Sequence, residues 1–280
     1  MNSRGDSGGS LVPSLDSTLS HDEVSMDLTM CGLLVERAEE MAALYAAHRD
    51  WTTVEKRWFD ERIDGRSTRG SSRKIYRVLS SRFKTAPSSL PAVSRLPSIF
   101  EQCETERDKA QVLYLYLIEA DSLMKFVIHQ YIRRLQQRGI GGLDFGQDVV
   151  NSILADFHYV DGGGFDYAES TIERWGSGLR SVMRDISVLE TQQAVKGDSP
   201  NIGDVPLLVA SGYSWERGGN EWLAEPLGWL YLFQIEEYRE SLIERVASHE
   251  DWEAGGLHGD LRLQPTGETY GWAEIAGADE

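Results

Sequence analysis

The chain has 280 residues, and 45 acidic against 28 basic side chains leave it with a formal charge of −17. Its 41% of hydrophobic residues and eight tryptophans exclude a disordered chain and indicate a globular protein. The longest apolar run, Val112–Ile118, is far shorter than the ~20 residues of a membrane-spanning helix. The N-terminus lacks the apolar stretch of a signal peptide, and Cys31 and Cys103 are too few for a disulfide framework. We therefore expect a soluble, cytoplasmic protein without a membrane partner.

The excess of acid does not by itself identify a partner. Only six of the 28 basic residues are lysines, and a solvated acidic surface with few lysines is typical of halophilic proteins. We therefore interpret the charge of −17 as an adaptation to salt, against which any cluster of basic residues becomes more informative.

The N-terminal quarter of the chain predicts a tail followed by helices. Residues 1–25 are rich in Ser, Gly and Asp and predict a disordered tail. An apolar stripe predicts a helix over Met30–His48. A second helix is expected from about Trp51, with Thr52 and Glu55 forming a capping box.

A basic stretch, Arg62–Lys84, follows these helices and holds eight basic residues and one acid, Asp64. Gly65 is expected to break the chain, and Ser67 or Thr68 to cap a helix that runs to about Lys84. At about 100° per residue, one sector of this helix is cationic and the opposite sector carries Ile75, Val78, Leu79 and Phe83. The helix is therefore predicted to pack on one face and to meet negative charge on the other.

Two helices joined by a Gly-containing turn, the second of them basic, have the pattern of a helix-turn-helix module, which we place at residues 26–88. On this interpretation the helix contacts double-stranded DNA, with phosphates bound by arginines and by the helix start. The predicted contact residues are Arg62, Arg66, Ser67, Thr68, Arg69, Arg73, Lys74, Arg77 and Lys84.

The Pro/Ser-rich segment Ala86–Pro97 predicts a domain boundary, and residues 89–280 predict a larger helical domain that ends in a β-hairpin. Helices are expected over Thr105–Ala120, Asp121–Arg138, Gln147–Tyr159, Asp166–Gln192 and Leu227–His249, with a loop-rich segment over Val195–Asn220. The hairpin is expected over Gly259–Ile275, turning at Pro265–Gly267. The predicted fold is therefore mainly α.

No catalytic motif is apparent. The six histidines are far apart in the sequence, and a metal site at His249 and His258 is disfavoured because acidic surfaces place such neighbours together by chance. Asp60, Glu61 and Asp64 are the only carboxylates beside the basic helix, and we interpret them as offsetting its arginines rather than as a nuclease site. We expect a protein that is not an enzyme and needs no cofactor or metal.

The run Cys31–Phe83 resembles the N-terminal part of the BrxA family, small proteins of BREX phage-defence systems. Gly32, Leu33, Leu34 and Glu36 match the start of the family's first helix. The sequence Arg66-Ser67-Thr68-Arg69, with Arg73 and Arg77, matches the entry into its basic helix. Similarity continues through Leu90–Pro97, Val112–Ile118, Asp121–Leu123, Phe126, Trp175 and Leu261–Trp272. This chain departs from the family in its length, its acidity and an extended loop at Asn201–Pro226.

The resemblance implies an almost all-helical protein, with an N-terminal helix-turn-helix module and a larger domain similar to NusB-type helical bundles. It also implies double-stranded DNA binding without catalysis, beside the other components of a BREX system. The alternative interpretation of the basic helix is a protein-interaction scaffold that docks on the acidic face of a partner subunit. The residues leave the oligomeric state and the DNA sequence preference open.

Overall fold

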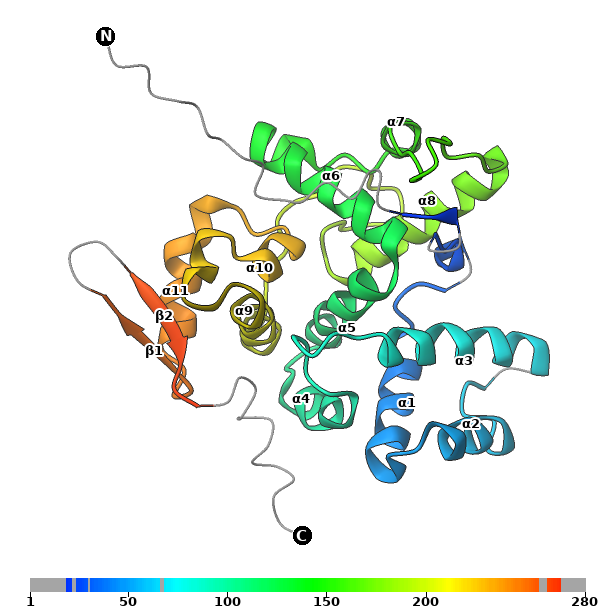
Figure 1. Ribbon diagram of the computed structural model, residues 1–280, viewed down its shortest axis with the longest axis horizontal. Coiled ribbons are helices and arrows are strands. Elements are labelled where there is room, and N and C mark those ends of the chain that lie inside the picture. Colours follow the sequence, from blue (N-terminus) through cyan, green and yellow to red (C-terminus); the bar gives the residue numbers. More distant parts are fainter. Residues whose placement is uncertain (1–18, 22–23, 30, 66–67, 257–260, 268–280) are drawn as a thin grey trace.

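The computed structural model describes residues 19–21, 24–29, 31–65, 68–256 and 261–267. The fold is mainly α, as predicted, and a two-stranded sheet closes the described part of the chain (Figure 1). The α-helices are α1 (Val35–His48), α2 (Trp51–Asp60), α3 (Arg69–Lys84), α4 (Leu96–Gln102), α5 (Glu106–Ala120), α6 (Ser122–Arg138), α7 (Gln147–Ala155), α8 (Glu169–Asp185), α9 (Asp204–Gly218), α10 (Leu227–Tyr231) and α11 (Arg239–Ala247). The strands are β1 (Trp252–Gly255) and β2 (Arg262–Pro265).

Helix α5 lies at the centre of the molecule (Figure 1). Every residue of its run Val112–Ile118 is buried, and a helix that is apolar on all sides needs neighbours on all sides. Those neighbours are α1, α3, α6, α8 and α9. Contacts cross the proposed boundary at residue 88, since Phe83 of α3 packs edge-on against Tyr116 of α5. The division into residues 26–88 and 89–280 remains a prediction.

The first helix starts later than predicted, at Val35 instead of Met30. Leu34 adopts a left-handed conformation (φ 56°), which a right-handed helix cannot contain. The second helix starts at Trp51 as expected, but its cap is Asp50, whose carboxylate accepts hydrogen bonds from the backbone amides of Thr52 and Thr53. The expected capping box at Thr52 is therefore wrong, because an aspartate one residue before the helix is already an effective N-cap.

Helices α7 and α8 are shorter than the sequence predicts and end at Ala155 and Asp185. After α8 the chain turns at Ser187, whose φ of 63° stops the helix.

The segment expected to be a loop over Val195–Asn220 contains helix α9, so this prediction is wrong. Small residues in and beside this segment allow helices to pack closely. Gly228 of α10 lies against the carbonyl of Ala210, where a side chain would collide. The hydroxyl groups of Ser211 and Ser214 donate to carbonyls one turn earlier in α9, so they can be buried.

The predicted helix Leu227–His249 is divided into α10, a short 3-10 helix (Glu236–Tyr238) and α11. The break falls at Phe233, which has φ 54° and is fully buried with its ring edge-on to that of Phe145. Burial of this ring therefore overrides the helical periodicity of the local sequence.

The C-terminal hairpin is present, but its strands differ from the prediction. The segment containing Leu263 is the second strand, β2, and pairs antiparallel with β1, so that Trp252 lies opposite Pro265. The expected second strand around Tyr270 and Trp272 lies outside the described residues. Trp222 donates its indole N–H to the carbonyl of Leu263, which fixes the hairpin to the helical body.

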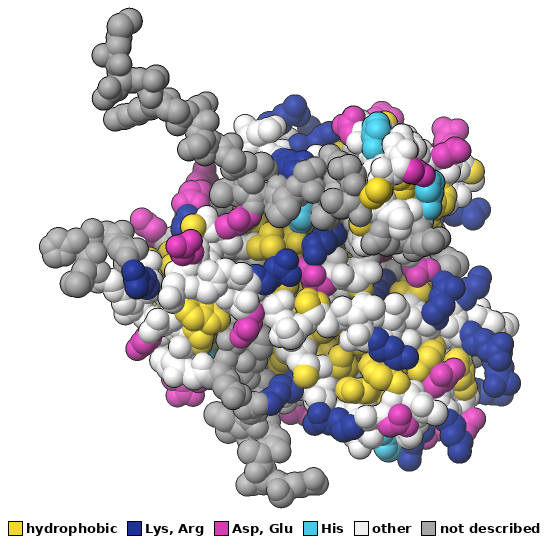
Figure 2. All heavy atoms as spheres, in the orientation of Figure 1, with side chains coloured by type: hydrophobic (Ala, Val, Ile, Leu, Met, Phe, Trp, Pro, Cys, Tyr) yellow, Lys and Arg dark blue, Asp and Glu magenta, His cyan; other side chains and the backbone are white. Residues whose placement is uncertain are grey.

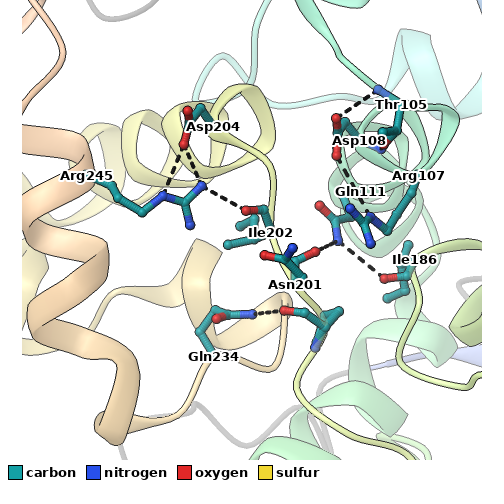
Figure 3. A network of polar contacts seen from close by, with 11 residues as sticks. Thr105, Arg107, Asp108, Gln111, Ile186, Asn201, Ile202, Asp204, Gln234 and Arg245 are labelled. Atoms are coloured by element: carbon teal, nitrogen blue, oxygen red, sulfur yellow. Dashed lines mark hydrogen bonds and ion pairs between the residues drawn. The ribbon is translucent and has the colours of Figure 1, made fainter.

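A polar network joins α5, α9 and α11 (Figure 3). Gln111 of α5 donates to the carbonyls of Ile186 and Asn201, and Arg245 of α11 donates to Ile202 and Asp204. The segment between α8 and α9 is therefore held on both sides by side chains that satisfy its backbone carbonyls. Within the described ranges, no helix is both long and apolar enough to cross a bilayer.

Candidate nucleic-acid interface

Helix α3 is the most cationic element of the structure. Its sixteen residues, RGSSRKIYRVLSSRFK, include six basic side chains and no acidic one. Ile75, Val78, Leu79 and Phe83 are buried, as predicted, and Tyr76 joins them. The opposite face is exposed and carries Arg69, Arg73, Lys74, Arg77 and Lys84. The predicted amphipathic helix with a packing face and a cationic face is therefore confirmed.

The predicted contact residues before α3 lie in the connection from α2. Arg62 and Thr68 are exposed, and Arg66 and Ser67 lie outside the described residues. Gly65 breaks the chain with φ 62°. Thr68 is the N-cap of α3: its hydroxyl oxygen accepts from the amide of Ser71 at 3.3 Å, so its first role is structural.

The exposed cations differ in whether their charge is already balanced. Arg62, Arg69, Arg73 and Lys74 form no ion pair with another residue in the described ranges. Arg77 pairs with Asp27 at 2.8 Å. The ammonium group of Lys84 lies 5.0 Å from the centre of the Trp51 ring. The N-terminal half of the helix therefore holds the cations that are free to meet an anionic ligand.

Arg82 belongs to the same basic stretch but is 7% exposed and has a different role. Its guanidinium group donates to the carbonyls of Gly32 (2.7 Å) and Cys31 (3.0 Å), and burial lowers its pKa. It thereby fixes the segment before α1 to α3. The sequence contains a signal for this burial, because Arg82 follows Ile75 by seven and Val78 by four positions, in the apolar sector of the helix.

A hollow of about 330 Å³ lies at the start of α3, between the connection and the helix. Its lining includes Arg62 and Arg69, but also Asp60 and Asp64. Arg62 and Arg69 therefore share this hollow with two carboxylates, although neither arginine forms an ion pair within the described ranges. The face that is uniformly cationic begins beyond this hollow, at Arg73 and Lys74.

Aromatic contacts position α3 on α2. Tyr76 lies between Trp58 and Phe59 (ring centroids 6.1 and 5.5 Å away), and its hydroxyl donates to the carbonyl of Trp51. The connection from α2 to α3, Glu61–Thr68, is longer than the three or four residues of a standard helix-turn-helix turn.

The space-filling view shows Lys and Arg side chains gathered at the right edge of the molecule, where Figure 1 places the start of α3 (Figure 2).

The described residues contain no group of three or more His, Cys, Asp or Glu side chains that could hold a metal ion. His249 lies 3.6 Å from Asp251, and His258 lies outside the described residues. Burial raises the pKa of the Cys103 thiol to about 12, which keeps it protonated and unreactive. Of the neighbouring aromatic residues Trp215, Trp222, Trp229, Tyr231 and Phe233, all are buried in the core except Trp215, which is half-buried.

These features define a class: a mainly helical protein whose concentrated positive charge lies on the exposed face of one helix. The family model BrxA matches residues 23–197, more than half of the chain. The chain therefore belongs to the BrxA family of BREX phage-defence systems. No curated protein and no solved structure matches it. The matched range ends before α9, so α9–α11 and the hairpin lie beyond the family match.

Proposed function

We propose that this chain is a non-enzymatic, cytoplasmic accessory protein of a BREX system and that it binds double-stranded DNA. Other BREX components are its expected protein partners. The observation that supports DNA binding most strongly is the charge of α3. It carries six cations and no acid within a chain of −17, and several of those cations are exposed without an ion-pair partner among the described residues.

Arg69, Arg73, Lys74 and Arg77 are the proposed phosphate contacts, supported by Arg62 and Arg66 from the preceding connection. Arg69 and Arg73 lie in the N-terminal part of the helix, which is the part that reaches base edges when a recognition helix enters the major groove. Thr68 positions the first turn of α3, and Ser67, which precedes it in the sequence, is a further proposed contact. Lys84 lies at the far end of the helix beside Trp51 and would contact the phosphate backbone there.

The test is fluorescence anisotropy of a labelled random duplex over a range of KCl concentrations. It compares the wild type with the triple variant Arg69→Glu/Arg73→Glu/Arg77→Glu, with helical content checked by circular dichroism. We expect the wild type to bind and the folded triple variant to lose binding. If the wild type fails to bind at every salt concentration, the proposal is wrong, and the cationic face would instead dock on an acidic partner subunit.

A further inference from the structure

A hollow of about 450 Å³ lies between the end of α6 and the segment that joins α10 to α11. Its floor is apolar, with Leu135, Trp229 and Leu242 buried and Leu230 and Ile235 half-buried. Its volume falls in the range of about 300–1,000 Å³ that is usual for ligand pockets. Helices α10 and α11 lie on the left of the molecule and α3 on the right (Figure 1). The hollow is therefore separate from the cationic face.

The buried polar group at this hollow is a hydrogen-bond acceptor. Gln234 is 6% exposed, and its amide nitrogen donates to the carbonyls of Pro200 and Leu232, both at 3.0 Å; Figure 3 draws one of these two bonds. These two bonds determine which end of the amide is the oxygen. That oxygen accepts no hydrogen bond from the residues described, and Gln234 lines the hollow. Gln234 also lines the neighbouring hollow formed with Ser199 and Arg245, so this fixed acceptor lies at the boundary between the two hollows.

The end of α6 adds negative character. Leu135, Gln136 and Gly139, from its last turn and cap, line the hollow. The carbonyls of a last helical turn have no partner within the helix and form the negative end of the helix dipole. Such a position favours a cationic group, and Arg138, in the same turn, is a cation there that does not line the hollow.

The rim of the hollow is acidic. Glu236 and Glu237 line it and are exposed. Arg239 also lines it, but its guanidinium group is already bound to the Glu236 carboxylate (3.1 Å) and to the carbonyl of Leu223. Glu237 forms no ion pair within the described ranges. Glu240 and Glu244 are exposed one turn apart on α11 and extend the acidic strip away from the hollow.

We propose that this hollow binds a basic segment of a partner protein, with an arginine side chain and a neighbouring apolar residue inserted into it. An arginine presents an apolar stem and a head that only donates hydrogen bonds, which suits an apolar floor with acceptors around it. The acidic strip along α11 continues beyond the hollow, and a peptide segment can cover both. Most of the lining lies beyond residue 197, so the inference depends neither on DNA binding nor on the family match.

The experiment uses the full chain and two fluorescein-labelled peptides. The first is Gly-Leu-Arg-Leu-Arg-Gly; the second has citrulline in place of both arginines, which keeps the length but removes the charge. Three variants are compared with the wild type. Ala224→Trp fills the hollow from an exposed lining position, Glu237→Gln removes one rim charge, and Glu221→Gln removes an exposed acid that does not line the hollow.

In anisotropy titrations, we expect the arginine peptide to bind roughly tenfold more tightly than the citrulline peptide, the effect of one charge-assisted hydrogen bond. Ala224→Trp should abolish this preference, Glu237→Gln should reduce it, and Glu221→Gln should leave it unchanged, with all variants folded by circular dichroism. Equal binding of the two peptides, or a preference that survives Ala224→Trp, would overturn the proposal. A dimer that forms at high protein concentration and is lost in Ala224→Trp would also overturn it, because a second copy of the chain would then occupy the hollow.

Discussion

The charge arrangement on α3 predicts how DNA binding should depend on salt. Four exposed cations, Arg62, Arg69, Arg73 and Lys74, have no ion-pair partner among the described residues. If each neutralises one phosphate, the slope of log K against log salt concentration is about −3.6, since each phosphate contributes roughly −0.9. Binding should then weaken about 150-fold between about 50 and 200 mM KCl. Each of the other proposed contacts, Arg66, Arg77 and Lys84, would steepen the slope by about 0.9 more, so about −3.6 is the shallowest slope that the proposal predicts.

The perturbation is Arg73→Gln, which keeps a polar side chain of similar length and removes only the charge. The slope should fall to about −2.7, so that the same salt range weakens binding by about 40-fold instead. The matched control is Arg138→Gln, an exposed arginine at the end of α6, which should leave the slope unchanged. Anisotropy with the random duplex measures both slopes. A wild-type slope near zero, or an equal reduction in both variants, would refute the assignment of α3 as the phosphate-binding face.

Three further predictions concern the surroundings of α3. Asp27→Ala removes the acid that pairs with Arg77 and so leaves this arginine available to a phosphate. DNA binding should tighten about threefold, which corresponds to a surface ion pair of roughly 0.7 kcal/mol. Unchanged or weaker DNA affinity in the anisotropy assay would contradict this prediction. Arg82→Met leaves two backbone carbonyls without their donor and should lower the free energy of unfolding by about 2–4 kcal/mol in urea, whereas the exposed Arg73→Met should change it by less than about 0.5 kcal/mol. Burial raises the pKa of the Asp121 carboxyl group to about 6, above its unfolded value of about 3.9. The folded protein therefore holds the carboxyl proton more tightly than the unfolded chain does. As a result, the stability that this residue contributes grows as pH falls from about 7 to 4. The variant Asp121→Asn cannot gain this stability, so it should lose about 2–3 kcal/mol relative to the wild type as pH falls over that range. Urea unfolding of both proteins at both pH values measures this change. If the difference in unfolding free energy between the two proteins is the same at both pH values, the carboxyl group does not titrate in this way.

Local sequence was sufficient to predict the elements whose structure depends on near neighbours in the chain. The apolar positions of α3 repeat at three and four residues, so they form one face of any α-helix, whatever packs against them. The break at Gly65 and the cap at Thr68 likewise follow from the conformational freedom of glycine and the short hydroxyl side chain of threonine. The cationic face and the mainly helical fold were therefore accessible without a structure.

Tertiary structure decided the features that depend on residues far apart in the chain. Arg77 meets Asp27 fifty positions earlier. Helix α9 forms in a segment rich in glycine and serine because small residues let α10 approach it closely, which composition alone cannot reveal. Phe233 leaves the helical conformation because its ring is buried against Phe145. The hollow with the apolar floor and the rim of Glu236 and Glu237 exists only where α6 meets the segment between α10 and α11. Burial and shape depend on what packs against a residue and not on its neighbours in sequence.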